Sequence, residues 1–271
     1  MSSQTKPNRR KGSGFTELLS IFLHLDHRLP VLEASAFLFF SSVLLFSSVS
    51  NGGAYSAYSY MAGPSGLSLT SLILVALILK NLASGWGGDF EKGTMQTFLT
   101  YPLSRGKAFL ARLVSSFLLP LGLLTLAQFS IVLLIAPGFA SAHIGSLVLG
   151  YLTALTTPIL IAALVVLMVL WAKSGGAPFG LGLVAYFMMF IFTAILLSIG
   201  YSTGNNDLVW AIFFINPVYA FSSYFGNPAG ISYNGPVPTY LQAVGLLTAN
   251  LLLSLTLLAL GALLFVKRTE T

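Results

Sequence analysis

The sequence predicts an all-α, polytopic membrane protein with six transmembrane helices, and two observations carry this prediction. Of its 271 residues, 56% are hydrophobic and only 7% are charged, whereas a soluble domain carries about 25% charged residues. Six segments also approach the roughly 20 apolar residues that a helix needs to cross the hydrocarbon core. These segments are 31–50, 67–83, 113–136, 144–172, 178–199 and 241–266.

Lysine and arginine lie on only one side of these segments, which predicts their orientation. Both ends of the chain are basic, so the tails 1–14 and 267–271 are expected in the cytoplasm and the protein in the plasma membrane. Lys80 lies near one end of the second segment, where its side chain can reach the interface. We therefore assign the net charge of +6 to membrane orientation and expect no nucleic-acid partner. The connections without lysine or arginine are 51–66, 137–143 and 200–240.

Residues 15–30 are expected to form an amphipathic helix that lies in the inner interface of the lipid bilayer. Apolar residues recur there at helical spacing, and polar residues fall on another face. The start of the chain lacks the short apolar run of a cleaved signal peptide. The apolar residues are Phe15, Leu18, Leu19, Phe22 and Leu25, and the polar ones are Glu17, Ser20, His24 and His27.

The inner loop 85–112 contains the most specific pattern in the sequence. Its four glycines within 85–93 are expected to loosen the exit from the second span. Met95, Phe98 and Leu99 then form a short apolar helix face at i, i+3 and i+4, and Pro102 is expected to stop this helix. A short helix with an apolar face and flanking charges is typical of a docking element.

A second helix is expected after Ser104, which suits the N-cap position. Arg105 and Lys107 then fall in the first turn, where the helix dipole disfavours cations. Lipid phosphates, the carboxylates of Asp89 or Glu91, or an acidic partner surface would compensate for these charges.

The outer connection has an unusual composition between 207 and 240. It holds one charge, Asp207, and many aromatic residues, and it is interrupted at Asn216 and Pro217. Because an even number of spans leaves no place for another crossing, we expect a re-entrant or interface-lying hairpin before the last span. It would be either an aromatic belt or an outer gate. The gate candidates are Trp210, Phe213, Phe214, Pro217 and Tyr219.

The inner loop resembles the type-2 ABC transporter permease family. The matching run is E-K-G-T, a short apolar helix, then Y-P-L-S-R-G-K and A-R-L at the entry to a span. Arg112 stands where that family more often has lysine. The interfacial helix, the six spans and the aromatic hairpin also resemble that family. The motif positions are Glu91, Gly93, Thr94, Pro102, Ser104 and Arg105.

The resemblance implies that this chain is one membrane half of a transporter. A second permease copy or a homologue would pair with it, and separate ABC ATPase subunits on the cytoplasmic side would bind ATP and Mg. The loop 85–112 would be the coupling helix, with charge pairing by Glu91 and Arg105, a backbone turn at Gly93 and a helix stop at Pro102. Thr94 and Phe98 complete the expected coupling residues. Hydroxyl residues of the fourth span, Thr153, Thr156 and Thr157, are candidates for the dimer or translocation interface.

The sequence offers no ATP-hydrolysing site of its own. The Gly106-Lys107 dipeptide lacks the rest of the G-x-x-x-x-G-K-[ST] phosphate loop, so we expect a non-enzymatic subunit without a cofactor or catalytic residue. The three histidines, His24, His27 and His143, do not lie on paired spans. Asp26 beside the first two fits a polar face of the interfacial helix better than a metal cluster, so no metal site is predicted.

The predicted function is that of a permease exporting an amphipathic or lipid-like substrate, because the spans show no strongly polar cavity. One alternative is a non-transporting membrane anchor or assembly subunit for a soluble partner. An ion-coupled secondary carrier is a weaker alternative. Such a carrier needs carboxylates within the membrane, and Glu33 is the single candidate in the sequence.

Overall fold

A computed structural model describes residues 14–26, 37, 40–44, 46, 52–62, 69–100, 104–225 and 235–268. Within these residues all regular structure is helical. The all-α class predicted from composition and periodicity is therefore confirmed for the described part of the chain.

Five of the helical segments are long and apolar enough to cross a membrane. They overlap the second to sixth segments expected from the sequence. The first expected span, 31–50, lies mostly outside the described residues, so the total of six spans stays a prediction. The five are α4–η2–α5 (Leu69–Leu79, Lys80–Gly87, Gly88–Glu91), α7–η3–α8 (Arg105–Leu113, Val114–Leu118, Leu119–Ile135), α10 (Ile144–Ala172), α11 (Gly176–Thr203) and α14 (Tyr240–Arg268).

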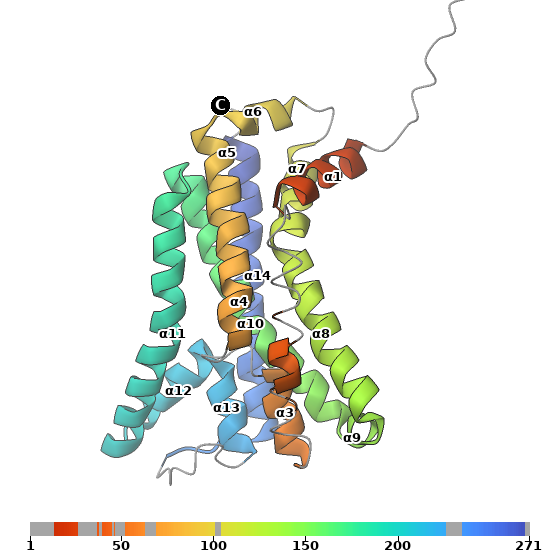
Figure 1. Cartoon of the computed structure of the whole chain (residues 1–271). Coiled ribbons are helices and arrows are strands. Elements are labelled where there is room, and N and C mark those ends of the chain that lie inside the picture. Colours follow the sequence, from red (N-terminus) through yellow and green to blue (C-terminus); the bar gives the residue numbers. More distant parts are fainter. Residues whose placement is uncertain are drawn as a thin grey trace, which may run out of the picture.

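The long helices form a bundle, and short helices gather at its two ends (Figure 1). We call one end the α6 end, because α6 lies across it beside α1, α5 and α7. We call the other the α13 end, where α3, α9, α12 and α13 lie. The short helices are α1 (Gly14–Asp26), α3 (Ala54–Ala62), α6 (Thr94–Leu99), α9 (Pro137–Ala142), α12 (Asn206–Ile215) and α13 (Pro217–Tyr224).

Helix α10 is the centre of the bundle and packs against α3, α4, α11 and α14. Its 29 residues span about 43 Å at 1.5 Å per residue, which exceeds the roughly 30 Å hydrocarbon core. Close helix approach, expected from the glycines at 176–182, is seen at Gly182. A Cβ there would lie 2.4 Å from Leu79 Cδ2 and 2.7 Å from Val165 Cγ2. The missing side chain lets α11 approach both α4 and α10.

The inner loop is shorter than expected, and its limits of 85–112 need correction. The helix of the second span continues without a break to Glu91, and the helix of the third span already begins at Arg105. Gly85 and Gly87 lie inside the π-helical segment η2 and do not loosen the helix. Their function is close packing, as described below, and among the described residues 92–100 and 104 lie between the two long helices.

The aromatic stretch before the last span folds into α12 and α13, which meet at Asn216 and Pro217 as the sequence predicted. Asn216 Oδ1 accepts the Val218 N–H at 3.3 Å and caps α13. The buried Asn250 of α14 donates its amide to Phe214 O and Ile215 O, at 3.0 and 3.1 Å. These bonds satisfy carbonyls at the end of α12 and attach the hairpin to α14.

Candidate functional site

We call residues 92–100, which the sequence predicts to include a coupling helix, the coupling segment. It follows the short helix α5, which ends the second long helix at the α6 end. Gly93 follows α5 with φ of +71°, a left-handed conformation that glycine adopts without strain. The backbone therefore turns at Gly93, as the sequence predicted, and α6 begins at Thr94. Helix α5 carries two carboxylates, Asp89 and Glu91, and each is bonded to a different part of the molecule.

Asp89 connects the coupling segment to the third long helix. Its Oδ2 accepts a hydrogen bond from Arg112 Nη2 at 2.7 Å, in an ion pair with the guanidinium. Its Oδ1 accepts the Thr94 hydroxyl at 3.1 Å, and Thr94 also bonds to the Asp89 carbonyl at 3.2 Å. The first residue of α6 is thus held directly by the carboxylate that pairs with α7.

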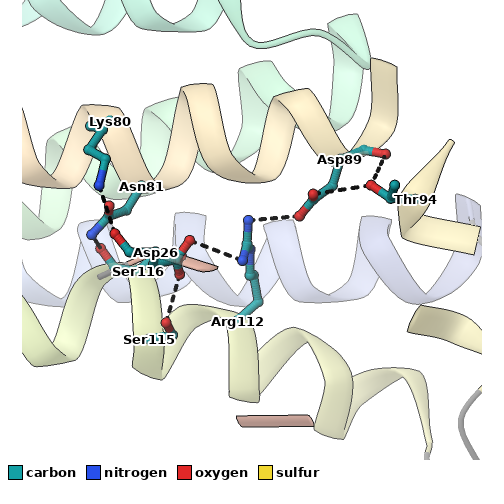
Figure 2. Close-up of polar contacts among 8 residues, drawn as sticks. All are labelled: Asp26, Lys80, Asn81, Asp89, Thr94, Arg112, Ser115 and Ser116. Atoms are coloured by element: carbon teal, nitrogen blue, oxygen red, sulfur yellow. Dashed lines mark hydrogen bonds and ion pairs between the residues drawn. The ribbon is translucent and has the colours of Figure 1, made fainter. Parts of the chain in front are cut away.

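Asp26, the last residue of α1, is bonded to the same arginine from the other side (Figure 2). Its Oδ1 lies 3.1 Å from Arg112 Nη1. Its Oδ2 accepts the hydroxyls of Ser115 and Ser116 at 2.6 and 2.9 Å. Both Asp26 and Arg112 are almost completely buried, with side-chain exposures of 2% each. Arg112 therefore bridges two carboxylates that come from α1 and α5.

Lys80 attaches the end of α1 to the second long helix as well. Its ammonium donates to the Asp26 carbonyl at 2.7 Å, which satisfies a carbonyl that has no partner within its own helix. Lys80 thus has a defined protein contact, and its expected position at the membrane interface stays a prediction. We call the set Asp26, Lys80, Asp89 and Arg112 the junction; its formal charges sum to zero.

Room for the junction is provided by Gly85. A Cβ at this position would lie 3.1 Å from Arg112 Nη2 and 3.2 Å from Asp26 Oδ1. Besides Arg112 of α7, the residues bonded to Asp26 lie on two π-helical segments, η2 with Lys80 and η3 with Ser115 and Ser116. Such segments are rare and occur frequently at functional sites.

Burial makes this arrangement energetically demanding. A buried charge costs several kcal/mol unless partners and hydrogen bonds replace its water. Here the Arg112 guanidinium has two carboxylates and also lies 4.7 Å from the centre of the Phe22 ring, a geometry that favours a cation. The junction therefore joins charged groups from α1, η2, α5 and α7.

Glu91 connects the coupling segment to the turn between α10 and α11. Its Oε1 accepts the Gly175 N–H at 2.9 Å. Two glycines allow the approach: a Cβ on Gly87 would lie 2.4 Å from Ser174 O, and one on Gly175 would lie 2.7 Å from Ala83 O. The charge pairing expected for Glu91 is therefore a hydrogen bond to backbone in this structure.

The apolar face of α6 points into the protein. Met95 is buried in the main core. Phe98 and Leu99 are partly buried against α1 and α7, with the Phe98 ring edge-on to Phe22 at 5.0 Å. The predicted i, i+3, i+4 face exists, but helix α1 and the bundle cover it. Gln96, Thr97 and Thr100 are exposed instead.

Other predicted coupling residues lie near this region. Arg105 Nη1 approaches Val266 O of α14 at 3.5 Å. Ser104 occupies the N-cap position of α7, though its side chain makes no capping bond. Pro102 lies outside the described residues. Within the described residues, no group of three His, Asp or Glu side chains is placed to hold a metal ion.

The three threonines expected at a dimer or translocation interface need correction. Thr153, Thr156 and Thr157 are at most 3% exposed. Thr153 bonds to Leu149 O and Thr156 to Thr153 O, so two of the hydroxyls are satisfied by their own helix. The structure therefore places these residues inside the chain, which does not fit a dimer interface, while a place along a translocation path stays a prediction.

The gate candidates lie at the α13 end. Phe213 and Pro217 are buried, Trp210 and Tyr219 are half-buried, and Phe214 is 37% exposed. Trp210, Phe213 and Tyr219 belong to a packed cluster with Tyr58 of α3. The structure brings the predicted residues together, while their function as gate or belt stays a prediction.

An apolar cleft of about 400 Å³ lies between η3–α8, α10 and α14. Its polar lining residues, Thr125 and Tyr151, bond to each other, with 2.7 Å between the hydroxyl oxygens. Since those two hydroxyls satisfy one another, the cleft offers mainly hydrocarbon contact. The other lining residues are Leu113, Phe117, Leu118, Leu121, Gly122, Leu155, Ile159, Leu255 and Leu258.

Sequence reasoning missed the junction. A signal was present, because Lys80 and Arg112 are charged residues beside long apolar runs and such residues usually have a named partner. The partner Asp26 is 86 positions from Arg112 and was assigned to a polar helix face.

Comparison with known protein families gives a match over most of the chain. The profile of the family described as Protein of unknown function (DUF2705) matches residues 28–269. The matched range includes α5, α6 and Arg112 and begins after α1. No curated protein matches the sequence.

Proposed function

We propose that this chain, which belongs to the DUF2705 family, is the membrane subunit of an ATP-driven transporter of the ABC type. Separate ATPase subunits would supply the energy from the cytoplasm, and a second permease copy or homologue would complete the pore. The proposal places the α6 end on the cytoplasmic side, because exposed lysines gather there.

One observation carries the proposal: the helix α5, which directly precedes α6, is bonded to several long helices at once. Asp89 connects it to the third long helix through Arg112. Glu91 connects it to the turn between α10 and α11 through Gly175. A displacement of α6 therefore acts on the ends of α5, α7, α10 and α11 together. A segment that only closed a loop would need no such bonds.

The cleft supports an amphipathic or lipid-like substrate. Its volume of about 400 Å³ is within the roughly 300–1,000 Å³ of ligand pockets, and its lining is apolar. We propose export of a molecule with a substantial hydrocarbon part, which reaches the cleft from the bilayer.

The proposal is tested by purifying the tagged chain from its native membranes and identifying the proteins that accompany it. A protein with a phosphate-binding loop and ATP hydrolysis in the purified complex is expected. Glu91→Ala should uncouple transport of a fluorescent phospholipid in vesicles from ATP hydrolysis. The exposed Ser141→Ala, on α9 at the opposite end, is the matched control.

Two outcomes contradict the proposal in different ways. If no ATPase accompanies the chain, the mechanism class is wrong. If an ATPase is bound but hydrolysis moves no substrate, the chain is a membrane anchor or assembly subunit, which is the alternative stated from the sequence.

A further inference from the structure

We propose that α6 contacts its partner through its polar outer face, and that this partner surface is acidic and rich in hydrogen-bonding groups. The proposal rests on the proposed function only for the identity of the partner, an ABC ATPase subunit. We define the α6 outer face as Lys92, Gln96, Thr97 and Thr100, all of which are exposed.

The apolar face of α6 is already covered by other parts of the chain. Met95 is 3% exposed, and Phe98 and Leu99 pack against α1 and α7. Helix α1 is fixed in this position by the junction, because Asp26 is bonded to Arg112 and to Lys80. Exposing the apolar face would require these buried ionic contacts to break.

A second feature is the distribution of charge at the α6 end. Lys92, Lys107, Lys173 and Lys267 are exposed there. Both carboxylates of α5 already have partners within the protein, Asp89 in Arg112 and Glu91 in the Gly175 backbone. Among the described residues these four lysines outnumber the exposed carboxylates of this end, Glu17 and Glu91, so the surface is net cationic and complements a partner surface with negative potential.

The composition of the α6 outer face does not suit contact with a lipid surface. A helix that lies on a membrane inserts an apolar face between the headgroups. The α6 outer face consists of a lysine, a glutamine and two threonines. The apolar face of α6, on the other side of the helix, packs against the protein. A polar face of this kind suits hydrogen bonds to the surface of a soluble protein.

The experiment uses the absence of cysteine from the chain, which makes single-cysteine labelling unambiguous. Thr97→Cys and Thr100→Cys report the outer face, Met95→Cys and Leu99→Cys report the covered face, and Ser141→Cys is the exposed control. Each variant is purified in detergent without its partner and treated with a biotin maleimide. The outer-face cysteines should react about tenfold faster than the covered ones, because accessibility controls thiol reactivity.

The same labelling is then performed on the complex purified from native membranes with its ATPase subunit. Thr97→Cys and Thr100→Cys should be protected about fivefold or more in the complex, whereas Ser141→Cys should react unchanged. Lys92→Glu should weaken association with the ATPase about tenfold, with the loss shrinking at high salt.

The outcomes separate the two proposals. An ATPase that is present but leaves Thr97→Cys and Thr100→Cys unprotected overturns the outer face as docking surface and leaves the proposed function intact. Protection or crosslinking at Leu99→Cys instead shows that α1 is released and the apolar face docks, which also overturns this inference. If no ATPase accompanies the chain, the proposed function fails and this partner fails with it.

Discussion

The two ends of the bundle are held together by opposite kinds of contact. At the α6 end, Asp26, Arg112 and Asp89 form a buried chain of charges. At the α13 end, aromatic rings pack without charges: Tyr58 lies 5.7 Å from Phe221 and 5.1 Å from Phe225 between ring centres. Ion pairs and their hydrogen bonds fix the orientation of both partners, whereas ring contacts tolerate several geometries. The difference indicates that precise orientation is maintained at the α6 end, where we place the partner.

The two ends also share one kind of contact, in which a polar side chain of a long helix bonds to a carbonyl at the end of a short helix. Lys80 bonds to the last carbonyl of α1, and Asn250 bonds to two carbonyls at the end of α12. In both cases a long helix supplies one polar side chain that satisfies the end of a short helix. Such groups need a partner where water is scarce.

The largest effect is expected from Arg112→Ala. It leaves two carboxylates unpaired at the junction, and breaking a buried ion pair costs about 3–5 kcal/mol. The free energy of unfolding can be measured by titrating the protein with SDS in mixed micelles. Arg105→Ala is the matched control and should cost less than about 1 kcal/mol. Equal losses in the two variants would contradict the prediction that the buried Arg112 stabilises the fold more than Arg105 does.

The aromatic end should respond to truncation of its buried ring. Phe221→Ala removes a fully buried side chain and should lower the free energy of unfolding by roughly 3 kcal/mol. This loss should not change with ionic strength, because the variant removes no charged group. Phe214→Ala, at a more exposed ring of the same hairpin, should cost under about 1 kcal/mol. A salt-dependent loss at Phe221 would break the comparison between the two ends.

A graded series at three neighbouring glycines tests how tightly the junction is packed. Gly87→Ala places a Cβ 2.4 Å from the Ser174 carbonyl, and this backbone clash should cost about 2–3 kcal/mol. Gly85→Ala meets side-chain atoms at 3.1 and 3.2 Å and should cost about 1–2 kcal/mol. Gly88 has open space around it, so Gly88→Ala should stabilise the helix by up to about 1 kcal/mol. The midpoints of thermal unfolding in detergent rank the three variants by stability. A different ranking would contradict the close contacts described for Gly87 and Gly85.

The smallest effect is expected from Asn250→Leu at the α13 end. The variant leaves the Phe214 and Ile215 carbonyls without this donor and should cost about 1–2 kcal/mol. Thr248→Val on the same helix removes an exposed hydroxyl that bonds only to its own helix, and it should change stability by less than about 0.5 kcal/mol. Hydrogen exchange of α12 should increase in the first variant alone; unchanged exchange would show that Asn250 does not anchor the hairpin.

The turn and the helix face of the candidate site could be predicted from the local sequence. The direction in which that face points could not. Gly93 adopts the expected left-handed turn, and Met95, Phe98 and Leu99 share one face because helical spacing requires it. Nothing in this spacing says whether that face points toward a partner or toward the chain itself. The answer came from α1, whose Phe22 covers Phe98.

The sequence by itself determined the class of this protein, the long apolar helices and the positions where the chain turns, because these follow from composition, periodicity and backbone preference. Only the tertiary structure decided that Asp26 and Asp89 share Arg112, that Gly85 makes room for them, and that the threonines of α10 are internal. Those contacts join residues far apart in the sequence, and the π-helical segments η2 and η3 rotate side chains away from the regular helical pattern. The physical reason is that a helix pattern specifies which residues share a face, whereas packing specifies what that face meets.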